Sequence, residues 1–171
     1  MFQKTRVIRR VLTVCLAASV LLAIASPGFG QINDAEAKRV AAYPLTIDLF
    51  RRFAAVSIEM AQIPKTDPAF HAISGMSDLP LDEKIKRMEA TPKAVAILKS
   101  HGISAQDLIM TSTAVTAVTV MKFSIQTGAG KNDANRLEWE ASSSDHVKFY
   151  DTHKEEMKKF QDDLMQAALR R

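Results

Sequence analysis

One group of side chains in the sequence has the right types to bind a metal ion or a haem. His146, His153 and Met157 follow one another at steps of seven and four residues, so a regular helix places them on one face. The two histidines are about 10.5 Å apart along such a helix, whereas a metal ion needs ligands at roughly 2 Å. They therefore cannot chelate one ion together. His153 and Met157 remain candidate ligands for a soft metal or a haem iron if another helix supplies more. The alternative is that all three side chains lie at the edge of the core, with the ring nitrogens bonded to backbone or water.

A tryptophan between two carboxylates is the second candidate site. Glu138 and Glu140 flank Trp139, and with the 65–80 segment they could form the site of an envelope hydrolase whose aromatic ring stacks on a sugar. A lone tryptophan that seals the edge of a core explains the same residues. The run over residues 142–146 also contains the residue types of a hydrolase, but it lacks the glycines and the strand–turn–helix setting of a nucleophile elbow.

The sequence argues against phosphate-loop and thiol chemistry. Gly128, Gly130 and Lys131 have the composition of a phosphate loop, but Asn132 replaces the required Ser or Thr and the loop follows a predicted helix instead of a strand. The single cysteine, Cys15, lies in the N-terminal apolar run. We therefore expect no disulfide, thiolate metal site or cysteine nucleophile after that run.

The first 30 residues have the pattern of a cleaved secretory signal peptide. A basic start without acidic residues precedes an apolar run from Val11 to Ala25, which is shorter than the roughly 20 residues of a membrane-spanning helix. We expect cleavage after Gly30, with Ala25 as the alternative, and export by the general secretory route. Arg9 and Arg10 keep a twin-arginine signal open as the less favoured route. The protein is thus expected to be periplasmic or secreted.

Removal of residues 1–30 would change the charge of the chain. Of the 23 basic and 19 acidic side chains in 171 residues, four basic and no acidic ones lie in the first 30, so 141 residues with 19 of each remain. A nucleic-acid-binding surface needs an excess of basic side chains, and nucleic acid is therefore not an expected partner. The remaining length suits one hydrophobic core and one domain.

Residues 105–126 are predicted to form the innermost helix. Ser104 and Asp107 have the spacing of a reciprocal capping box, and no glycine or proline follows before Gly128. Apolar residues occupy the whole circumference, with Asp107 and Lys122 as the only charges. A helix that is apolar on every side is buried on every side. Its threonines and its lysine make it too polar for a membrane span.

Amphipathic segments are predicted to surround this helix. Apolar residues at steps of three and four predict a helix from about residue 45 to Pro64, and shorter patterns predict helices over 81–88 and 92–101. Residues 64–80, rich in proline, are predicted to be a long connection that can hide a helical turn. One last amphipathic helix is predicted from Ser144 onwards.

The predicted fold is an all-α, single-domain bundle of four to five helices. Its layout is a signal peptide over 1–30, a flexible arm over 31–43 and a helical domain over 44–171. The sequence contains no convergent acid–base set and no complete metal site. We therefore expect a non-enzymatic exported protein without a cofactor that binds another protein or an apolar ligand. The 105–126 helix has more apolar surface than its predicted neighbours can cover, and a homodimer that covers the remainder is therefore also expected.

Overall fold

The chain is described by a computed structural model, which covers residues 34–127 and 143–170. Within these two ranges it forms eight helices and no strands, which confirms the all-α prediction. No helix in these ranges is both long and apolar enough to cross a membrane. The predicted signal peptide, the phosphate-loop-like residues and the Glu138–Glu140 segment lie outside the described residues.

The helices outnumber the predicted four to five. The predicted arm and the predicted connection over 64–80 each contain a helix, and the predicted last helix is divided into two. In chain order the helices are α2 (Asp34–Ala41), α3 (Ile47–Ala61), α4 (Pro68–Ser74), α5 (Leu81–Glu89), α6 (Pro92–Ser100), α7 (Ala105–Thr127), α9 (Ser144–Thr152) and α10 (Lys154–Leu169).

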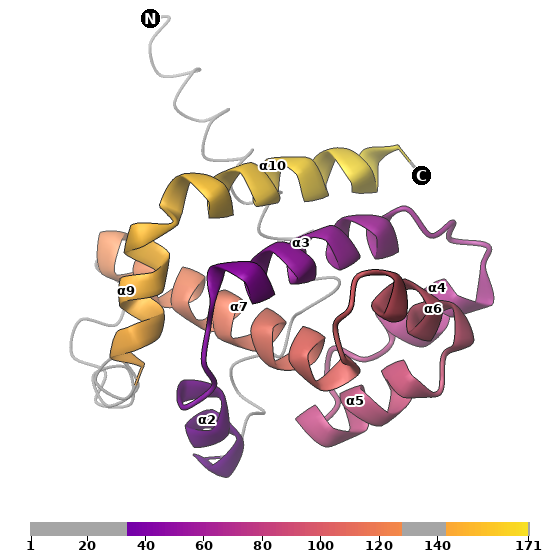
Figure 1. Cartoon of the computed structure of the whole chain (residues 1–171), viewed down its shortest axis with the longest axis horizontal. Coiled ribbons are helices and arrows are strands. Elements are labelled where there is room, and N and C mark those ends of the chain that lie inside the picture. The colour runs from indigo at the N-terminus through magenta and orange to yellow at the C-terminus, as the bar shows by residue number, and fades with distance from the viewer. Residues whose placement is uncertain (1–33, 128–142, 171) are drawn as a thin grey trace, which may run out of the picture.

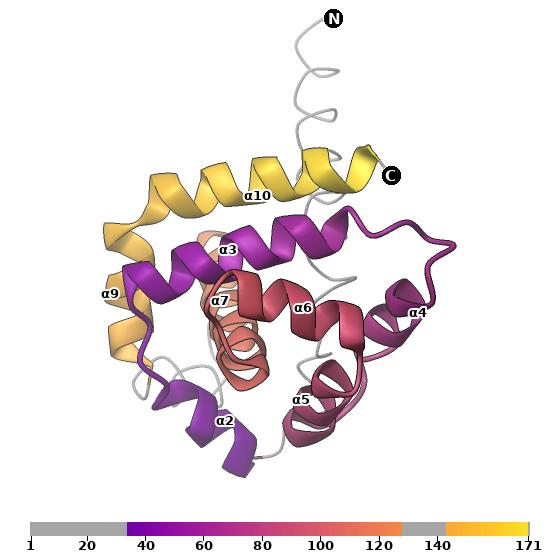
Figure 2. The same ribbon diagram turned by 45° about the vertical axis from the view of Figure 1, so that its right-hand side comes forward.

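Helix α7 lies in the middle of the assembly, as Figures 1 and 2 show. It packs against α2, α3, α5 and α9. Helices α3 and α10 lie side by side and run in the same direction, opposite to α7 (Figure 1). Helices α4, α5 and α6 form one end of the molecule, and α9 closes the other end (Figure 2). The helix predicted over 105–126 therefore exists and is central.

The prediction that α7 is shielded on every side holds only for its first half. Between Leu108 and Val118 every residue is buried except Ser112 and Thr116, which are half-buried. Further along, Val120 is 41% exposed and Phe123 is 54% exposed. The sequence could not reveal this difference in exposure, because apolar residues continue along α7 beyond the point where neighbouring helices cover it.

The predicted flexible arm over 31–43 contains helix α2, which is docked on the body. Val40 is buried in the core, and Arg39 forms a 2.6 Å ion pair with Asp82 on α5. Glu36 Oε1 accepts a 2.8 Å hydrogen bond from the backbone amide of Leu81 at the start of α5, which occupies one of the amide groups that a helix N-terminus leaves open. The prediction of a mobile arm was wrong for residues 34–43, because these contacts join residues more than 40 positions apart and leave no local pattern.

The predicted last helix is interrupted at His153. This residue has φ −113° and ψ 23° and separates α9 from α10. The interruption turns the chain through a corner, so that α9 packs against α7 and α10 packs against α3. No glycine or proline marks the corner, and the amphipathic pattern alone therefore predicted one straight helix.

The connection predicted over 64–80 contains a helical turn, as the sequence allowed. Helix α4 begins after Asp67, whose carboxylate accepts a 2.8 Å hydrogen bond from the amide of Ala69.

At the end of α6, Gly102 adopts a left-handed φ of 61°, which glycine accommodates without strain. His101 precedes it, and its Nε2 lies 2.7 Å from the Glu59 carboxylate.

Four phenylalanines join α3, α9 and α10. Phe50 contacts Phe149 with ring centroids 5.9 Å apart and Phe160 at 5.7 Å, both edge to face. Phe53 contacts Phe160 at 5.3 Å. Such pairs add to the energy of area burial. This aromatic cluster packs α9 and α10 against the start of α3.

Candidate functional site

A partly buried polar junction lies where the connection from α2 to α3 meets α7 and α9. We define this polar junction as Tyr43, Asp107, Thr111, Ser143 and His146. Tyr43 lies in the connection, Asp107 and Thr111 lie in the first two turns of α7, Ser143 is the N-cap residue of α9, and His146 lies in the first turn of α9.

Asp107 is the acceptor of the junction. Its carboxylate accepts a 2.6 Å hydrogen bond from the Tyr43 hydroxyl and a 2.7 Å one from Ser104 Oγ. The amide of Asp107 donates in turn to Ser104 Oγ at 3.0 Å. The predicted capping box at the start of α7 therefore forms, and it carries one further partner that the local sequence did not indicate, the phenol of Tyr43.

These contacts shift the pKa values of both groups. Burial alone would raise the pKa of the Asp107 carboxyl, but hydrogen bonds from Tyr43 and Ser104 outweigh it and lower the pKa. Burial, followed by the hydrogen bond to Asp107, raises the pKa of the Tyr43 phenol far above its ordinary value. Asp107 is thus a saturated carboxylate and Tyr43 a protonated phenol, which suits them to holding α7 in place and not to general acid–base catalysis.

His146 connects α9 to the same tyrosine. Its Nε2 lies 2.6 Å from the backbone carbonyl oxygen of Tyr43. Because a carbonyl oxygen can only accept, Nε2 carries the hydrogen. In the neutral ring Nδ1 then bears a lone pair. The residue is only 1% exposed, so its ring is held in one orientation on the inner side of α9.

Three buried polar atoms of the junction lack a hydrogen-bond partner among the residues that the structure describes. They are Thr111 Oγ1, Ser143 Oγ and His146 Nδ1. Thr111 lies close enough to the Tyr43 phenol to oppose part of the rise in its pKa, yet it forms no hydrogen bond of acceptable geometry. Buried polar groups are almost always paired, and three exceptions in one place distinguish this junction from the rest of the core.

The junction has the residue types of a serine–histidine pair, but both side chains of this pair are closed off from solvent. Ser143 and His146 are three residues apart at the start of α9 and are each 1% exposed. The Nε2 atom of the histidine bonds to a backbone carbonyl and not to a carboxylate that would stabilise an imidazolium.

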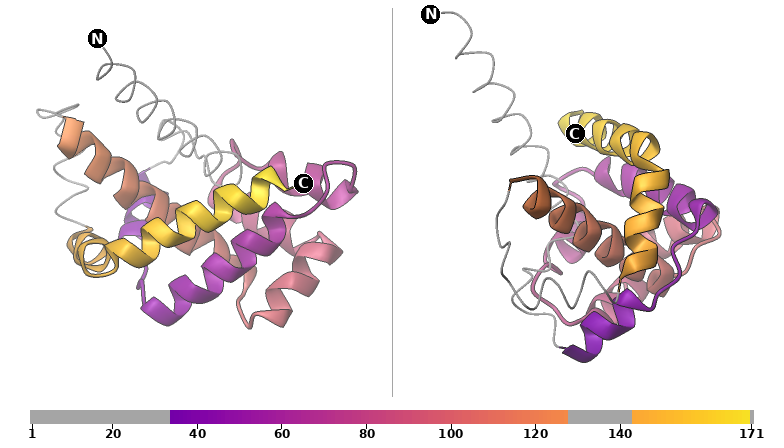
Figure 3. Two further views of the ribbon diagram at one scale, coloured as in Figure 1. Left: turned by 90° about the horizontal axis from the view of Figure 1, so that it is seen from above. Right: turned by 90° about the vertical axis from the view of Figure 1, so that its left-hand side faces the viewer.

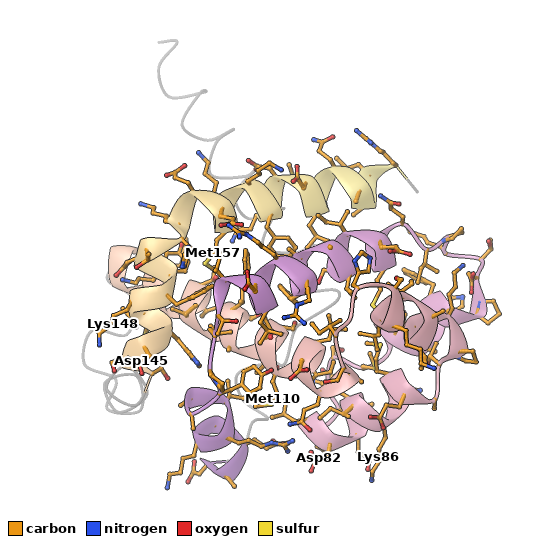
Figure 4. The ribbon with its side chains drawn as sticks, in the orientation of Figure 1. Asp82, Lys86, Met110, Asp145, Lys148 and Met157 are labelled. Carbon is orange, nitrogen blue, oxygen red and sulfur yellow. The ribbon has the colours of Figure 1, made fainter. Side chains whose placement is uncertain are left out.

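The predicted metal ligands occupy three different environments. His146 is bonded to Tyr43, and His153 lies at the corner with its ring centroid 4.7 Å from that of Phe149. Met157 is 2% exposed and belongs to the hydrophobic core, at the start of α10 (Figure 4). Within the described ranges, no three His, Cys, Asp or Glu side chains gather as metal ligands would. The metal or haem site remains a prediction from the sequence.

The second notable feature is an exposed apolar strip, which we call the α7 face and define as Val120 and Phe123. These residues are three apart and therefore neighbours on the helix surface. Leu169 near the end of α10, at 71% exposed, is the other exposed large apolar side chain of the described residues. Figure 3 shows that the C-terminal end of α7 projects past the N-terminal start of α3.

The α7 face is bordered by a neutralised charge. Lys122 Nζ lies 2.7 Å from the Asp151 carboxylate on α9 and 6.0 Å from the ring centroid of Tyr150. Its side chain is only 20% exposed. The single charged residue of this part of α7 is thereby turned toward α9, and Val120 and Phe123 present an uncharged surface.

The sequence of the chain matches no protein-family model and no curated protein, and its fold matches no solved structure.

Proposed function

We propose that the chain is an exported, non-enzymatic binding protein whose contact surface is the α7 face. The exposure of Val120 and Phe123, on a helix that is largely buried between Leu108 and Val118, carries this proposal. When a partner removes two neighbouring large apolar side chains from water, the free energy of the system falls, so burial of this surface favours binding. The partner that we propose is a second copy of the chain.

Self-association is favoured by the symmetry of the surface. A twofold dimer needs only one self-complementary patch, because the same residues face each other across the axis. Such an interface must avoid like charges, since each charge meets its own copy. From Leu108 to Phe123, α7 carries one charged residue, Lys122, and Asp151 already neutralises it. Two copies of α7 can therefore approach without charge repulsion.

The polar junction supports this role as a rigid base. Tyr43 ties the start of α7 to the connection before α3, and its backbone carbonyl ties α9 to the same point. The first half of α7 is thereby fixed from several sides, so the second half is presented in one orientation. A preorganised surface loses less entropy on binding than a mobile one.

The proposed location follows from the sequence of residues 1–30. Their basic start, short apolar run and small residues before Gln31 support cleavage after Gly30 and release into the periplasm or the medium. The proposed partner is therefore encountered outside the cytoplasm.

The molar mass of residues 31–171 in solution tests the proposal. Light scattering after size exclusion, at about 100 µM protein, is expected to give twice the monomer mass, and dilution is expected to give the monomer. Val120→Lys and Phe123→Lys are expected to give the monomer at both concentrations, because each places a like charge opposite its own copy. Both positions are exposed, so the fold should tolerate lysine.

Leu169→Lys is the matched control. Leu169 is also an exposed apolar side chain but lies on α10, away from the α7 face, so this variant is expected to keep the dimer. A wild-type chain that stays monomeric at about 100 µM would contradict the proposed partner. A dimer lost equally in the Leu169 variant would show that α7 is not the contact surface.

A further inference from the structure

Helix α9 covers one side of α7 with a contact that leaves polar groups unpaired. Ser143 Oγ and His146 Nδ1, both on α9, have no hydrogen-bond partner in the described part of the chain. Water would pair both atoms if α9 moved away. The two unpaired atoms raise the free energy of the closed position of α9, and this cost disappears in an open position where water pairs them.

The N-terminal end of α9 has no side-chain cap. Its N-cap residue, Ser143, makes no side-chain capping hydrogen bond, whereas the backbone N–H of His153 donates to the Phe149 carbonyl at the other end. A helix of nine residues is short for independent stability. The single non-helical residue His153 separates it from α10, so α9 can change its angle without unfolding α10.

The side chains that hold α9 in the closed position are few in kind. Its polar contacts to the other described segments are His146 to the Tyr43 carbonyl and Asp151 to Lys122. Its apolar contacts are Phe149 against Phe50 and the partly buried Val147 and Tyr150 against the core. Asp145 and Lys148 point outward from α9 (Figure 4) and pair with each other, so they add nothing to its attachment.

We infer that α9 opens as a unit, turning about His153, and that this motion enlarges the α7 face. Lys122, which borders Val120 and Phe123, is the α7 residue that Asp151 of α9 contacts. Opening therefore uncovers the flank of α7 next to the exposed strip. The functional part of this inference rests on the proposed binding role, in which a second copy would occupy the enlarged face.

Hydrogen exchange of the backbone amides, followed by mass spectrometry on residues 31–171, tests the opening in each copy. Peptides covering 144–152 are expected to exchange at least about tenfold faster than those covering 108–118 and 154–169, because local opening exposes α9 alone. Equal protection of all three segments would overturn the inference.

A matched pair of serine variants identifies the cause. Ser143→Ala removes a buried hydroxyl without a partner and is expected to slow exchange of α9 by about fivefold. Ser144→Ala removes the neighbouring exposed hydroxyl and is expected to change exchange by less than about twofold. Equal effects of the two variants, or faster exchange in Ser143→Ala, would contradict the role of the unpaired group. Because exchange reports opening within one copy, a failed dimer measurement and a failed exchange measurement are distinguishable.

Discussion

His146 on α9 and Tyr43 before α3 are joined by a 2.6 Å hydrogen bond although 103 residues separate them. The hydroxyl of the same Tyr43 binds Asp107 on α7. One residue therefore connects the segment before α3, the central helix α7 and the first turn of α9. Removal of its contacts is therefore expected to lower the stability of the whole fold.

Tyr43→Phe is expected to lower the free energy of unfolding by about 1.5–3 kcal/mol, because the lost hydrogen bond has a charged acceptor. Urea unfolding followed by circular dichroism measures the loss. Tyr150→Phe is the control: Tyr150 is also half-buried, and its ring, which lies beside Lys122, is retained. Equal losses in the two variants would show that the bond to Asp107 contributes nothing special.

Stability is expected to fall in acid through Asp107. Its folded-state pKa lies below the ordinary value, which is near 3.9 in the unfolded chain. The carboxylate therefore stabilises the fold above about pH 4, and this contribution is lost as the pH falls through the folded-state pKa.

The comparison is between wild type and Asp107→Asn in urea unfolding from pH 5 down to pH 2. The variant should show a shallower decline, because its side chain binds no proton in this range. Asp145→Asn, at a side chain that is 89% exposed, should follow the wild-type curve. An unchanged slope for Asp107→Asn would rule out this carboxylate as a source of acid sensitivity.

The two halves of α7 should respond differently to truncation. Met110 points into the interior (Figure 4) and is 1% exposed, so Met110→Ala is expected to cost about 2–5 kcal/mol. Val120→Ala, at a position that is 41% exposed, should cost less than about 0.5 kcal/mol in the monomer. Thermal or urea unfolding of dilute protein measures both. Similar losses would mean that both halves are equally enclosed.

Export can be tested with the full chain in a bacterial host. The periplasmic fraction is expected to contain a species that begins at Gln31, identified by intact mass, and Gly28→Leu together with Gly30→Leu should block cleavage there because the peptidase prefers small residues. A species that begins at Ser26 would move the boundary to the alternative site. Full-length protein confined to the cytoplasm would contradict export.

The sequence predicted those parts of the fold that local chemistry determines. The capping box at Ser104 placed the start of α7, and a proline-free apolar run carried it to its end at Thr127, one residue beyond the prediction. Gly102 ended α6 as expected. For α3 the predicted spacing of three and four agrees with the buried Phe53, Val56 and Met60, and Phe50 is buried beside them at 1% exposed.

Features that depend on distant contacts escaped the sequence. Helix α2 is held by pairs such as Arg39 with Asp82, and its short polar sequence resembled an arm. The polar junction combines residues from three separate segments. The sequence had singled out Asp107 as a capping residue and His146 as a candidate metal ligand, but it did not indicate that Tyr43 contacts both. The corner at His153 arises because α9 and α10 pack on different helices, which no periodic pattern records.

Disulfide formation through a cysteine at position 120 tests the central claim most directly. Residues 31–171 contain no cysteine, so Val120→Cys introduces a single thiol on the α7 face and Leu169→Cys introduces one on α10. With mild oxidant at about 100 µM protein, Val120→Cys is expected to form a covalent dimer well before Leu169→Cys, because two α7 helices hold the thiols close together. Equal rates for the two variants, or no covalent dimer from Val120→Cys, would contradict binding through this face.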